Sequence, residues 1–416
     1  MRELKQQLIS ALLVILTVAA IVCTGINFQQ QKQFRLPEDG VTWIESTAGG
    51  PARALHVVPE GAAERAGIKT GDVLKKINTV PIANSLDVTR VLVSLGAWKT
   101  ADYILERGGI EIKAKVIIRE RVPDVDRYYQ YAVGVVYLAI GIFVYFRRGN
   151  APKALHFYAL CLASFILSTF HYTGKLNEFD KVIYWGNVAA GLLAPTVFLH
   201  FSLNFPQPRS WVRGPLRTMC LYTPAGVVML LYLGLASGTL RVTAVPLIEL
   251  RWLLDRVWMV YLSLAYLSGA WALSRSYRRE RDPIVRQQLK WLRNGAAFGV
   301  MPFTAIYVLP YLMGVIPGPY LGLAVFSLLL IPVTWAYAIL RYRLMDVDVI
   351  FQQGYAYTLA TLAVLGIFYG MVVSISSFDE LSPSAMTVLL LIATLIFQPI
   401  RNWIQAQLDR YYFKER

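Results

Sequence analysis

Residues 129–146 read YQYAVGVVYLAIGIFVYF, and Arg147 and Arg148 follow them directly. The stretch contains no charged side chain. About 20 predominantly apolar residues are enough for an α-helix to cross the hydrocarbon core of a bilayer. The stretch therefore predicts a transmembrane helix, and it begins a long apolar part of the chain.

Similar apolar stretches recur along the sequence. The others are Leu8–Ile26, Ala154–Tyr172, Val182–Leu203, Leu216–Leu235, Val257–Leu273, Gly295–Val315, Tyr320–Leu340, Tyr355–Ile375 and Ser384–Phe397. Together they predict a polytopic α-helical membrane protein with about ten transmembrane helices. A basic start before an apolar core is also typical of signal peptides, so Leu8–Ile26 is either a retained anchor or a cleaved leader.

The composition excludes two classes of protein. Of the 416 residues, 56% are hydrophobic and 16% are charged, whereas soluble domains usually carry about 25% charged residues. The net charge of +15 would suit a nucleic-acid-binding protein only if the basic residues gathered on one soluble face. Between Arg35 and Asp126, however, 13 basic residues balance 13 acidic ones. We therefore expect no soluble enzyme and no nucleic-acid partner, and we expect the lipid bilayer to surround most of the chain.

The basic residues between the spans predict the orientation. With the N-terminus in the cytoplasm, the cytoplasmic loops and ends carry 21 Lys and Arg residues, and the opposite side carries 7 outside the charge-balanced stretch Arg35–Asp126. An excess of Lys and Arg marks the cytoplasmic loops of membrane proteins. The sequence thus predicts cytoplasmic N- and C-termini and an extracytoplasmic insert at 30–127.

The insert is expected to form an α/β domain. Leu55–Val58 and Val73–Ile77 read as strands, and a short helix between them is ended by Gly67. Ser85 is expected to cap a second helix. Residues 103–106 and 110–118 flank Arg107-Gly108-Gly109 and predict a hairpin.

One stretch of the insert has a specific pattern. Residues 59–78 read PEGAAERAGIKTGDVLKKIN, which closely resembles bacterial PDZ domains over a region of about eighty residues. The resemblance implies a groove that receives an extended peptide or a C-terminus as an added strand. Carried onto this sequence, it places the groove between a strand with Ala54, Leu55, His56 and Val57 and a helix with Val88 and Leu92.

The individual residues of that groove have two interpretations each. Val88 and Leu92 either line the groove or belong to the core of the domain, and His56 either contacts a ligand or is an ordinary strand residue. The family's glycine-rich carboxylate loop is poorly matched at residues 49–53, which read GGPAR. The sequence therefore does not predict capture of a C-terminal carboxylate.

No motif for catalysis or metal binding is present in the sequence. None of the histidines has a glutamate beside it, as a His-Glu-x-x-His zinc site requires, and there is no Gly-x-Ser-x-Gly elbow or phosphate-binding loop. Cys23, Cys161 and Cys220 form no Cys-x-x-Cys pair and fall in or beside the spans. We expect no enzyme activity, no metal and no cofactor.

Several connecting segments share a second resemblance. They are Leu199–Pro206, Arg281–Trp291, Tyr337–Val349 and Phe397–Phe413. In this order they resemble the multi-pass sensor region of bacterial signalling receptors, among them the quorum-sensing histidine kinase of the competence system, which carries a PDZ domain, and receptors that end in GAF and PP2C-like phosphatase domains. The resemblance implies a location in the bacterial cytoplasmic membrane. Such receptors continue into a kinase or phosphatase domain, so this chain is either a fragment or a protein whose output is lost or supplied by another protein.

The last segment predicts an amphipathic helix. Its apolar residues recur at three-to-four spacing, and we single out Ile400, Trp403, Leu408 and Tyr411. Such a stripe suits a cytoplasmic signalling linker that forms a homodimer with a second copy. The alternative is a terminal helix that lies along the membrane surface.

The sequence thus predicts a first transmembrane helix at 1–28, a PDZ domain at 30–127, a multi-pass sensor domain at 128–398 and a linker helix at 399–416. We expect a receptor module that detects an extracytoplasmic peptide, protein or other ligand and passes a signal to a kinase or phosphatase. One alternative is a PDZ-bearing scaffold protein that docks a partner. The other is a transporter.

Overall fold

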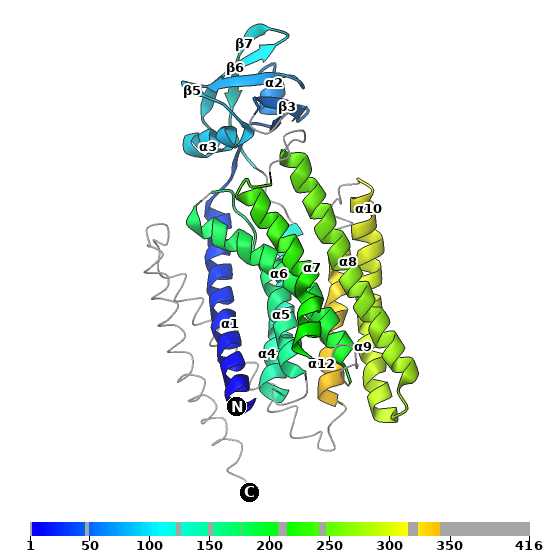
Figure 1. Cartoon of the computed structure of the whole chain (residues 1–416). Helices are drawn as coiled ribbons and strands as arrows, with labels where there is room; N and C mark the ends of the chain where they lie inside the picture. The colour runs from blue at the N-terminus through cyan, green and yellow to red at the C-terminus, as the bar shows by residue number, and fades with distance from the viewer. Residues whose placement is uncertain are drawn as a thin grey trace.

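The fold is taken from a computed structural model, which describes residues 2–45, 50–121, 126–148, 153–175, 177–206, 214–240, 247–314 and 323–341. Two parts are evident in Figure 1: a bundle of long helices and a small α/β domain at one end of it. The N-terminus of the chain lies at the opposite end of the bundle (Figure 1). The helix α1 connects the two ends.

The bundle contains the long apolar helices. They are α1 (Arg2–Gln33), α4 (Asp126–Arg148), α5 (Ala154–Thr169), α6 (Glu178–Asn204), α7 (Pro215–Ala236), α8 (Leu247–Arg279), α9 (Pro283–Pro302) with its continuation η2 (Phe303–Val308) and α10 (Leu309–Leu312), and η3 (Leu323–Leu329), which leads into α12 (Leu330–Arg341). Seven helical stretches of the described residues are long and apolar enough to cross a membrane, and α5 is a shorter apolar helix. The prediction of a polytopic helical membrane protein is therefore confirmed.

The predicted number of spans is tested only in part. Each predicted span up to Leu340 overlaps a helix of the bundle in the described residues. The last two, Tyr355–Ile375 and Ser384–Phe397, lie outside the described residues. The count of about ten helices thus stays a prediction.

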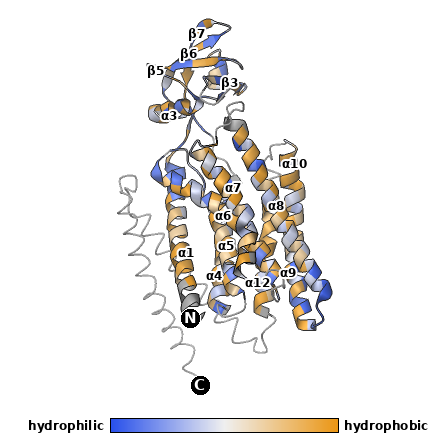
Figure 2. Ribbon diagram, viewed as in Figure 1, coloured by the Kyte–Doolittle hydropathy of each residue, from blue (hydrophilic) through white to orange (hydrophobic). Residues whose placement is uncertain are grey.

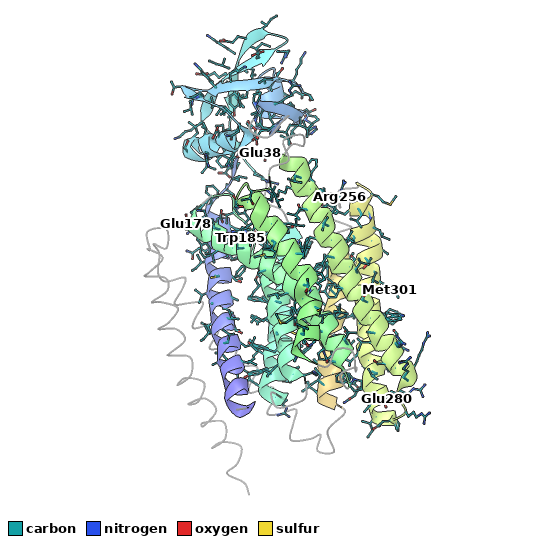
Figure 3. The ribbon with its side chains drawn as sticks, in the orientation of Figure 1. Glu38, Glu178, Trp185, Arg256, Glu280 and Met301 are labelled. Carbon is teal, nitrogen blue, oxygen red and sulfur yellow. The ribbon has the colours of Figure 1, made fainter. Side chains whose placement is uncertain are left out.

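Apolar side chains on the outside of the bundle show which surface would contact lipid. Leu216 and Met219 on α7 are 75% and 68% exposed, and Met301 on α9 is 61% exposed and points outward (Figure 3). The polar residues gather at the ends: Figure 2 shows hydrophilic residues at the turn between α8 and α9, and Glu280 in that turn lies at the far end from Glu38 beside the α/β domain (Figure 3). This distribution is that of a helix bundle in a bilayer.

Trp335 of α12 lies in the centre of the bundle. Its indole ring is fully buried and stacks on Phe198 and Phe201 of α6, with ring centroids 4.9 and 4.4 Å apart. Its Nε1 donates a hydrogen bond of 3.1 Å to the carbonyl oxygen of Leu292 in α9. One side chain thus joins α6, α9 and α12, and it meets the hydrogen-bonding need of a buried indole.

Glycines allow two helix pairs to approach closely. On α9, Gly295 and Gly299 are four residues apart, and a Cβ atom on Gly295 would lie 2.7 Å from the Cβ atom of Thr334 in α12. On α4, a Cβ atom on Gly141 would lie 2.5 Å from the Cβ atom of Cys161 in α5. Small residues at such contacts are typical of helix packing within membranes, where close backbone approach supplies the van der Waals energy.

The α/β domain is a mixture of short strands and two helices. The strands are β1 (Pro37–Glu38), β2 (Val41–Glu45), β3 (Ala52–Val57), β4 (Val73–Ile77), β5 (Val80–Pro81), β6 (Thr100–Arg107), β7 (Ile110–Ile117) and β8 (Arg119–Glu120), and the helices are α2 (Ala62–Arg65) and α3 (Ser85–Leu95). The main sheet has the order β2-β3-β4-β6-β7, with β5 paired to β4. All of its pairs are antiparallel. The predicted hairpin is β6–β7, and the predicted strand Val73–Ile77 is β4.

The start of α3 differs from the prediction. Asn84, and not Ser85, is the N-cap residue, and its side chain accepts a hydrogen bond of 2.9 Å from the backbone N–H of Asp87. Ser85 is already the first residue of the helix, and both its N–H and its hydroxyl group bind Glu45. Asn and Ser cap helices equally well, so the sequence alone did not separate the two positions.

Asp72 joins the turn before β4 to the end of β6. Its carboxylate accepts hydrogen bonds from Nε and Nη2 of Arg107 at 2.6 and 2.7 Å and from the backbone N–H of Lys69 at 2.8 Å. Burial raises the pKa of Asp72, but the bonds from Arg107 and Lys69 outweigh it and hold the pKa below its usual value. The pair therefore stabilises the domain while Asp72 is ionised.

The Asp72→Asn variant is expected to destabilise the α/β domain by about 2 kcal/mol at neutral pH, because the hydrogen bonds to a charged group are lost. The folded-state pKa of Asp72 is lower than the unfolded value of about 3.9, so the wild-type advantage is present above that value and disappears as the pH falls through the folded pKa. Hydrogen exchange of the β4 and β6 amides, corrected for intrinsic rates, measures both effects.

The matched control for this prediction is Glu106→Gln. Glu106 forms an ion pair of 2.8 Å with Lys75, but the two side chains are 43% and 49% exposed. An exposed pair contributes only about 0.2–1 kcal/mol. Equal effects of Asp72→Asn and Glu106→Gln would contradict the role given to Asp72.

Candidate functional site

The edge strands of the main sheet are β2 and β7, and β3, the strand that the sequence indicated, lies inside the sheet. β3, with Ala54 to Val57, pairs with β2 along its length and with β4 at Arg53. Ala54 also exchanges backbone hydrogen bonds with Gly71 and Asp72 at 2.8 and 2.9 Å. An added strand needs a free row of backbone N–H and C=O groups, so the prediction that β3 forms one wall of a strand-addition groove is wrong.

The structure places the predicted groove residues in two groups. Leu55 and His56 are exposed and Val57 is half-buried on β3, whereas Ala54, Val88 and Leu92 are buried in the core of the domain. Of the two interpretations of Val88 and Leu92, the core role is therefore the one the structure shows. The six residues do not converge on one groove.

The residues that build the actual edge were missed by the sequence analysis. Asp39 precedes β2 and is buried, and its carboxylate accepts hydrogen bonds from the N–H of Val41, from Nε1 of Trp43 and from the hydroxyl group of Tyr103 at 2.8–2.9 Å. Burial raises the pKa of Asp39, while these donors lower it in part. Asp39 thus fixes the start of β2 to the core.

Glu45 fixes the other end of β2. Its Oε1 accepts hydrogen bonds from the N–H and the hydroxyl group of Ser85 at 3.1 and 2.9 Å. Ser85 begins α3, where a carboxylate is stabilised by the unpaired N–H groups of the helix start. The edge strand and the helix are therefore held side by side, with α3 in contact with both β2 and β3. The only sequence signal for this contact is the acidic residue Glu45 at the end of an apolar segment.

A short neck connects the domain to the bundle. The strands β1 and β8 pair with each other, with Pro37 opposite Glu120 and Glu38 opposite Arg119. The N–H of Arg121 donates a further hydrogen bond of 2.9 Å to the carbonyl oxygen of Leu36. The two passes of the chain thus form one two-stranded ribbon that stands directly on the end of α1 and the start of α4. In addition, α8 contacts β2 of the domain.

A polar network lies below the neck, where α1, α4 and the loop between α5 and α6 meet. Asn27 and Gln31 of α1 donate hydrogen bonds of 2.8 and 2.7 Å to the carbonyl oxygen of His171. The hydroxyl group of Tyr131 in α4 donates to Oδ1 of Asn27 at 3.1 Å, and Nη1 of Arg127 donates to Oε1 of Gln31 at 3.2 Å. Side chains of α1 and α4 and the backbone of the loop between α5 and α6 are therefore joined in one network below the neck.

The loop between α5 and α6 is held by Asp180 of α6. Its carboxylate accepts hydrogen bonds from the N–H and the hydroxyl group of Thr173 and from the N–H of Gly174 at 2.7–3.1 Å. Asn177 caps the helix by accepting a bond of 2.8 Å from the N–H of Asp180. The loop that completes the network thus has a defined position.

The remaining predicted site residues lie elsewhere. Ile400, Trp403, Leu408 and Tyr411 of the expected linker are outside the described residues. Among the residues that the structure describes, no group of three or more His, Cys, Asp or Glu side chains could hold a metal ion.

Comparisons with known proteins give one match at the level of a family. Residues 131–348 match the model of the N-terminal 7TM region of histidine kinases. A search of curated proteins found no match. Among solved structures, the chain is similar to an HtrA-type protease, AlgW, with a decapeptide, at 15% identity over 24% of this chain and 34% of that chain, with a TM-score of 0.22. It is also similar to a serine endoprotease from Yersinia pestis, at 23% identity over 20% of this chain and 30% of that chain, with a TM-score of 0.17.

The two proteases are matched over only about a third of their length. The family match, in contrast, begins inside α4 and runs through α12, so it contains the helix bundle that packs around Trp335. It also covers more than half of the 416 residues. The chain therefore belongs to the family of N-terminal 7TM regions of histidine kinases, the multi-pass sensor regions of these receptors.

Proposed function

We propose that the α/β domain is a PDZ-type domain that receives an extracytoplasmic peptide or protein segment as an added strand on the outer edge of β2. The observation that carries the proposal is the position of β2: in the part of the chain that the structure describes, it has a partner strand only on its β3 side, and α3 lies beside it. An edge strand next to a helix is the arrangement that binds extended peptides by main-chain hydrogen bonds.

The connections of the domain support a role in signalling. The ribbon of β1 and β8 stands on α1 and α4, and α8 contacts β2 itself. A ligand on β2 would therefore be connected to the membrane helices in two ways, through the ribbon and through α8. The ligand shifts the bundle from one helix packing to another only to the extent that it binds the protein more tightly in the second packing.

The proposal places the domain outside the bacterial cytoplasmic membrane and both termini in the cytoplasm. The basic turn between α8 and α9 supports this orientation, because it lies at the end of the bundle opposite to the α/β domain (Figure 2). The signal would pass through α12 to a linker helix with Ile400, Trp403, Leu408 and Tyr411, which would form a homodimer and act on a kinase or phosphatase output domain. In this proposal the chain itself catalyses no reaction.

Peptide binding to the full-length chain in lipid nanodiscs tests the proposal. The probes are random nonapeptides, each with a free or an amidated C-terminus. For any peptide that binds, strand addition predicts that the backbone N–H groups of residues 41–45 become protected from hydrogen exchange. It also predicts that N-methylation of alternate peptide amides abolishes binding in one register and leaves it unchanged in the other.

The Glu45→Ala variant is expected to weaken peptide binding about tenfold, because α3 loses the carboxylate that holds it beside β2. Glu64→Ala is the matched control: Glu64 also binds a backbone N–H group near a helix start, that of Glu60 at 2.6 Å, but at α2. Protection outside β2, or equal weakening by both variants, would disprove strand addition on this edge. Peptide binding that leaves the activity of the kinase or phosphatase output unchanged would favour a scaffold protein over a receptor.

A further inference from the structure

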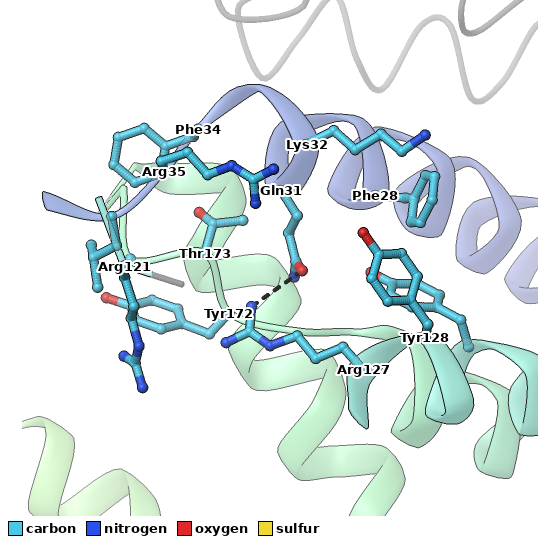
Figure 4. A pocket seen from close by; sticks show the side chains of 13 residues that line it. Phe28, Gln31, Lys32, Phe34, Arg35, Arg121, Arg127, Tyr128, Tyr172 and Thr173 are labelled. Carbon is cyan, nitrogen blue, oxygen red and sulfur yellow. Dashed lines mark hydrogen bonds between the residues drawn. The ribbon is translucent and has the colours of Figure 1, made fainter. Parts of the chain in front are cut away.

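We propose that a hollow beneath the neck binds an anionic amphiphile through a phosphate or carboxylate group. Four separate stretches of the chain line it: the end of α1 with residues 34–36 that follow it, Arg121 on the other side of the neck, the start of α4, and the loop between α5 and α6 (Figure 4). Its volume is about 200 Å³, which suits a head group rather than a whole lipid. The inference is independent of the peptide proposal, because the hollow and β2 share no residue.

The charged residues that the structure describes in the lining of the hollow all have one sign. They are Lys32, Arg35, Arg121 and Arg127, and no Asp or Glu is among the described lining residues. Within the described ranges, none of these four cations has a carboxylate within 4.0 Å. Like charges gathered in a concave site repel one another, and an anion between them removes that repulsion.

The partners that the cations do have are neutral. Arg127 donates to the side-chain oxygen of Gln31 at 3.2 Å, and Nζ of Lys32 lies 4.8 Å from the centre of the Phe28 ring. In Figure 4, the side chains of Arg35 and Arg127 reach toward the same space beside Gln31 and Thr173. A guanidinium group binds a phosphate or carboxylate with two parallel hydrogen bonds, so these two arginines form the expected anion contact.

Five of the nine other lining residues are aromatic. Phe28 packs edge to face against Tyr131 with ring centroids 5.3 Å apart, and Phe34, Tyr128 and Tyr172 complete the wall. A site that combines cations with aromatic rings matches a molecule with an anionic head and an apolar body. Aromatic and basic residues also anchor helices at the membrane surface, so the experiment needs a control for this general role.

The hollow lies directly on the polar network of α1. Arg127, which would bind the anion, also bonds to Gln31, and Gln31 in turn bonds to the carbonyl oxygen of His171. An anion that draws Arg127 away from Gln31 would weaken the connection of α1 to α4. The occupied and empty states would therefore differ in how the neck is fixed to the bundle.

The experiment uses the full chain in nanodiscs. One arm compares discs of phosphatidylcholine alone with discs that also contain phosphatidylglycerol, and retained lipids are counted by native mass spectrometry. The other arm adds inorganic phosphate to the phosphatidylcholine discs and follows the melting temperature. Retention of phosphatidylglycerol would identify a membrane lipid as the source of the anion, and stabilisation by phosphate alone would identify a soluble anion.

The Arg35→Gln/Arg127→Gln variant is expected to weaken anion binding at least about tenfold, because the charge-assisted hydrogen bonds of both guanidinium groups to the anion are lost. The matched control is Arg278→Gln/Arg279→Gln, which removes the same charge from exposed residues at the end of α8 and is expected to leave binding unchanged.

Equal binding by both double variants, or no binding of either probe to the wild-type chain, would overturn the inference. If the first variant does not fold, hydrogen exchange of residues 27–36 in the wild-type chain decides instead. Protection that appears with phosphatidylglycerol or phosphate supports the site, and unchanged exchange with both probes refutes it.

Discussion

Replacement of Trp335 by alanine is expected to destabilise the folded bundle by about 3–5 kcal/mol, the range for removing a buried large aromatic side chain. The substitution leaves a cavity between Phe198 and Phe201, whose rings stack on the indole at 4.9 and 4.4 Å. It also removes the hydrogen bond from Nε1 to the carbonyl oxygen of Leu292. Because Trp335 joins α12 to α6 and α9, we expect α12 to separate from the bundle first.

Thermal unfolding of the purified chain in detergent measures this effect. The matched control is Trp271→Ala, because Trp271 on α8 is 62% exposed and contacts Arg275, whose guanidinium carbon lies 5.5 Å from its ring. We expect the control to stay within about 1 kcal/mol of the wild type, since it removes an exposed side chain and one cation–π contact. Similar melting temperatures for the two variants would show that Trp335 is not the centre of the packing.

The Gly295→Leu variant is expected to lose about 3 kcal/mol, the upper part of the range for overpacking. A Cβ atom at this position would lie 2.7 Å from the Cβ atom of Thr334 and 3.0 Å from the carbonyl oxygen of Leu330. The backbone carbonyl group has no alternative rotamer, so α9 and α12 would have to move apart. Separation of α9 and α12 would also disturb the packing of Trp335, whose buried ring lies on α12.

The control for this prediction is Gly226→Leu on α7, where no atom lies within 4 Å of the added Cβ position. Leucine has a higher helix propensity than glycine by about 1 kcal/mol, so the control is expected to be neutral or slightly stabilising. The order of the two melting temperatures decides the prediction. A Gly226 variant as unstable as the Gly295 variant would show that glycine is needed for reasons other than helix contact.

The spans could be predicted from the sequence because apolar length is a local property. Helix ends could not: Val257–Leu273 was the predicted span, whereas α8 runs from Leu247 to Arg279. Hydropathy marks the part of a helix that would cross hydrocarbon, but backbone hydrogen bonds continue through polar residues such as Arg251 and Ser276. At α8 the predicted span is therefore shorter than the helix.

The order of strands in the α/β domain could not be predicted for a different reason. Alternating apolar residues indicate that a segment is a strand, but its neighbours are set by contacts between distant residues. β4 pairs with β6, and this places β3 inside the sheet and leaves β2 at the edge. The residues that fix β2, Asp39 and Glu45, act through Tyr103 and Ser85, which lie 64 and 40 positions further along the chain.

The pairing of β1 with β8 makes the α/β domain a closed insertion. Cα atoms of directly paired antiparallel residues are about 4.5–5.5 Å apart, so the chain leaves and re-enters the bundle almost at one point. At the neck, the domain is thus inserted between α1 and α4 in the way that a tight turn would be. A shorter or longer insertion with the same paired ends would leave the spacing of α1 and α4 at the neck unchanged.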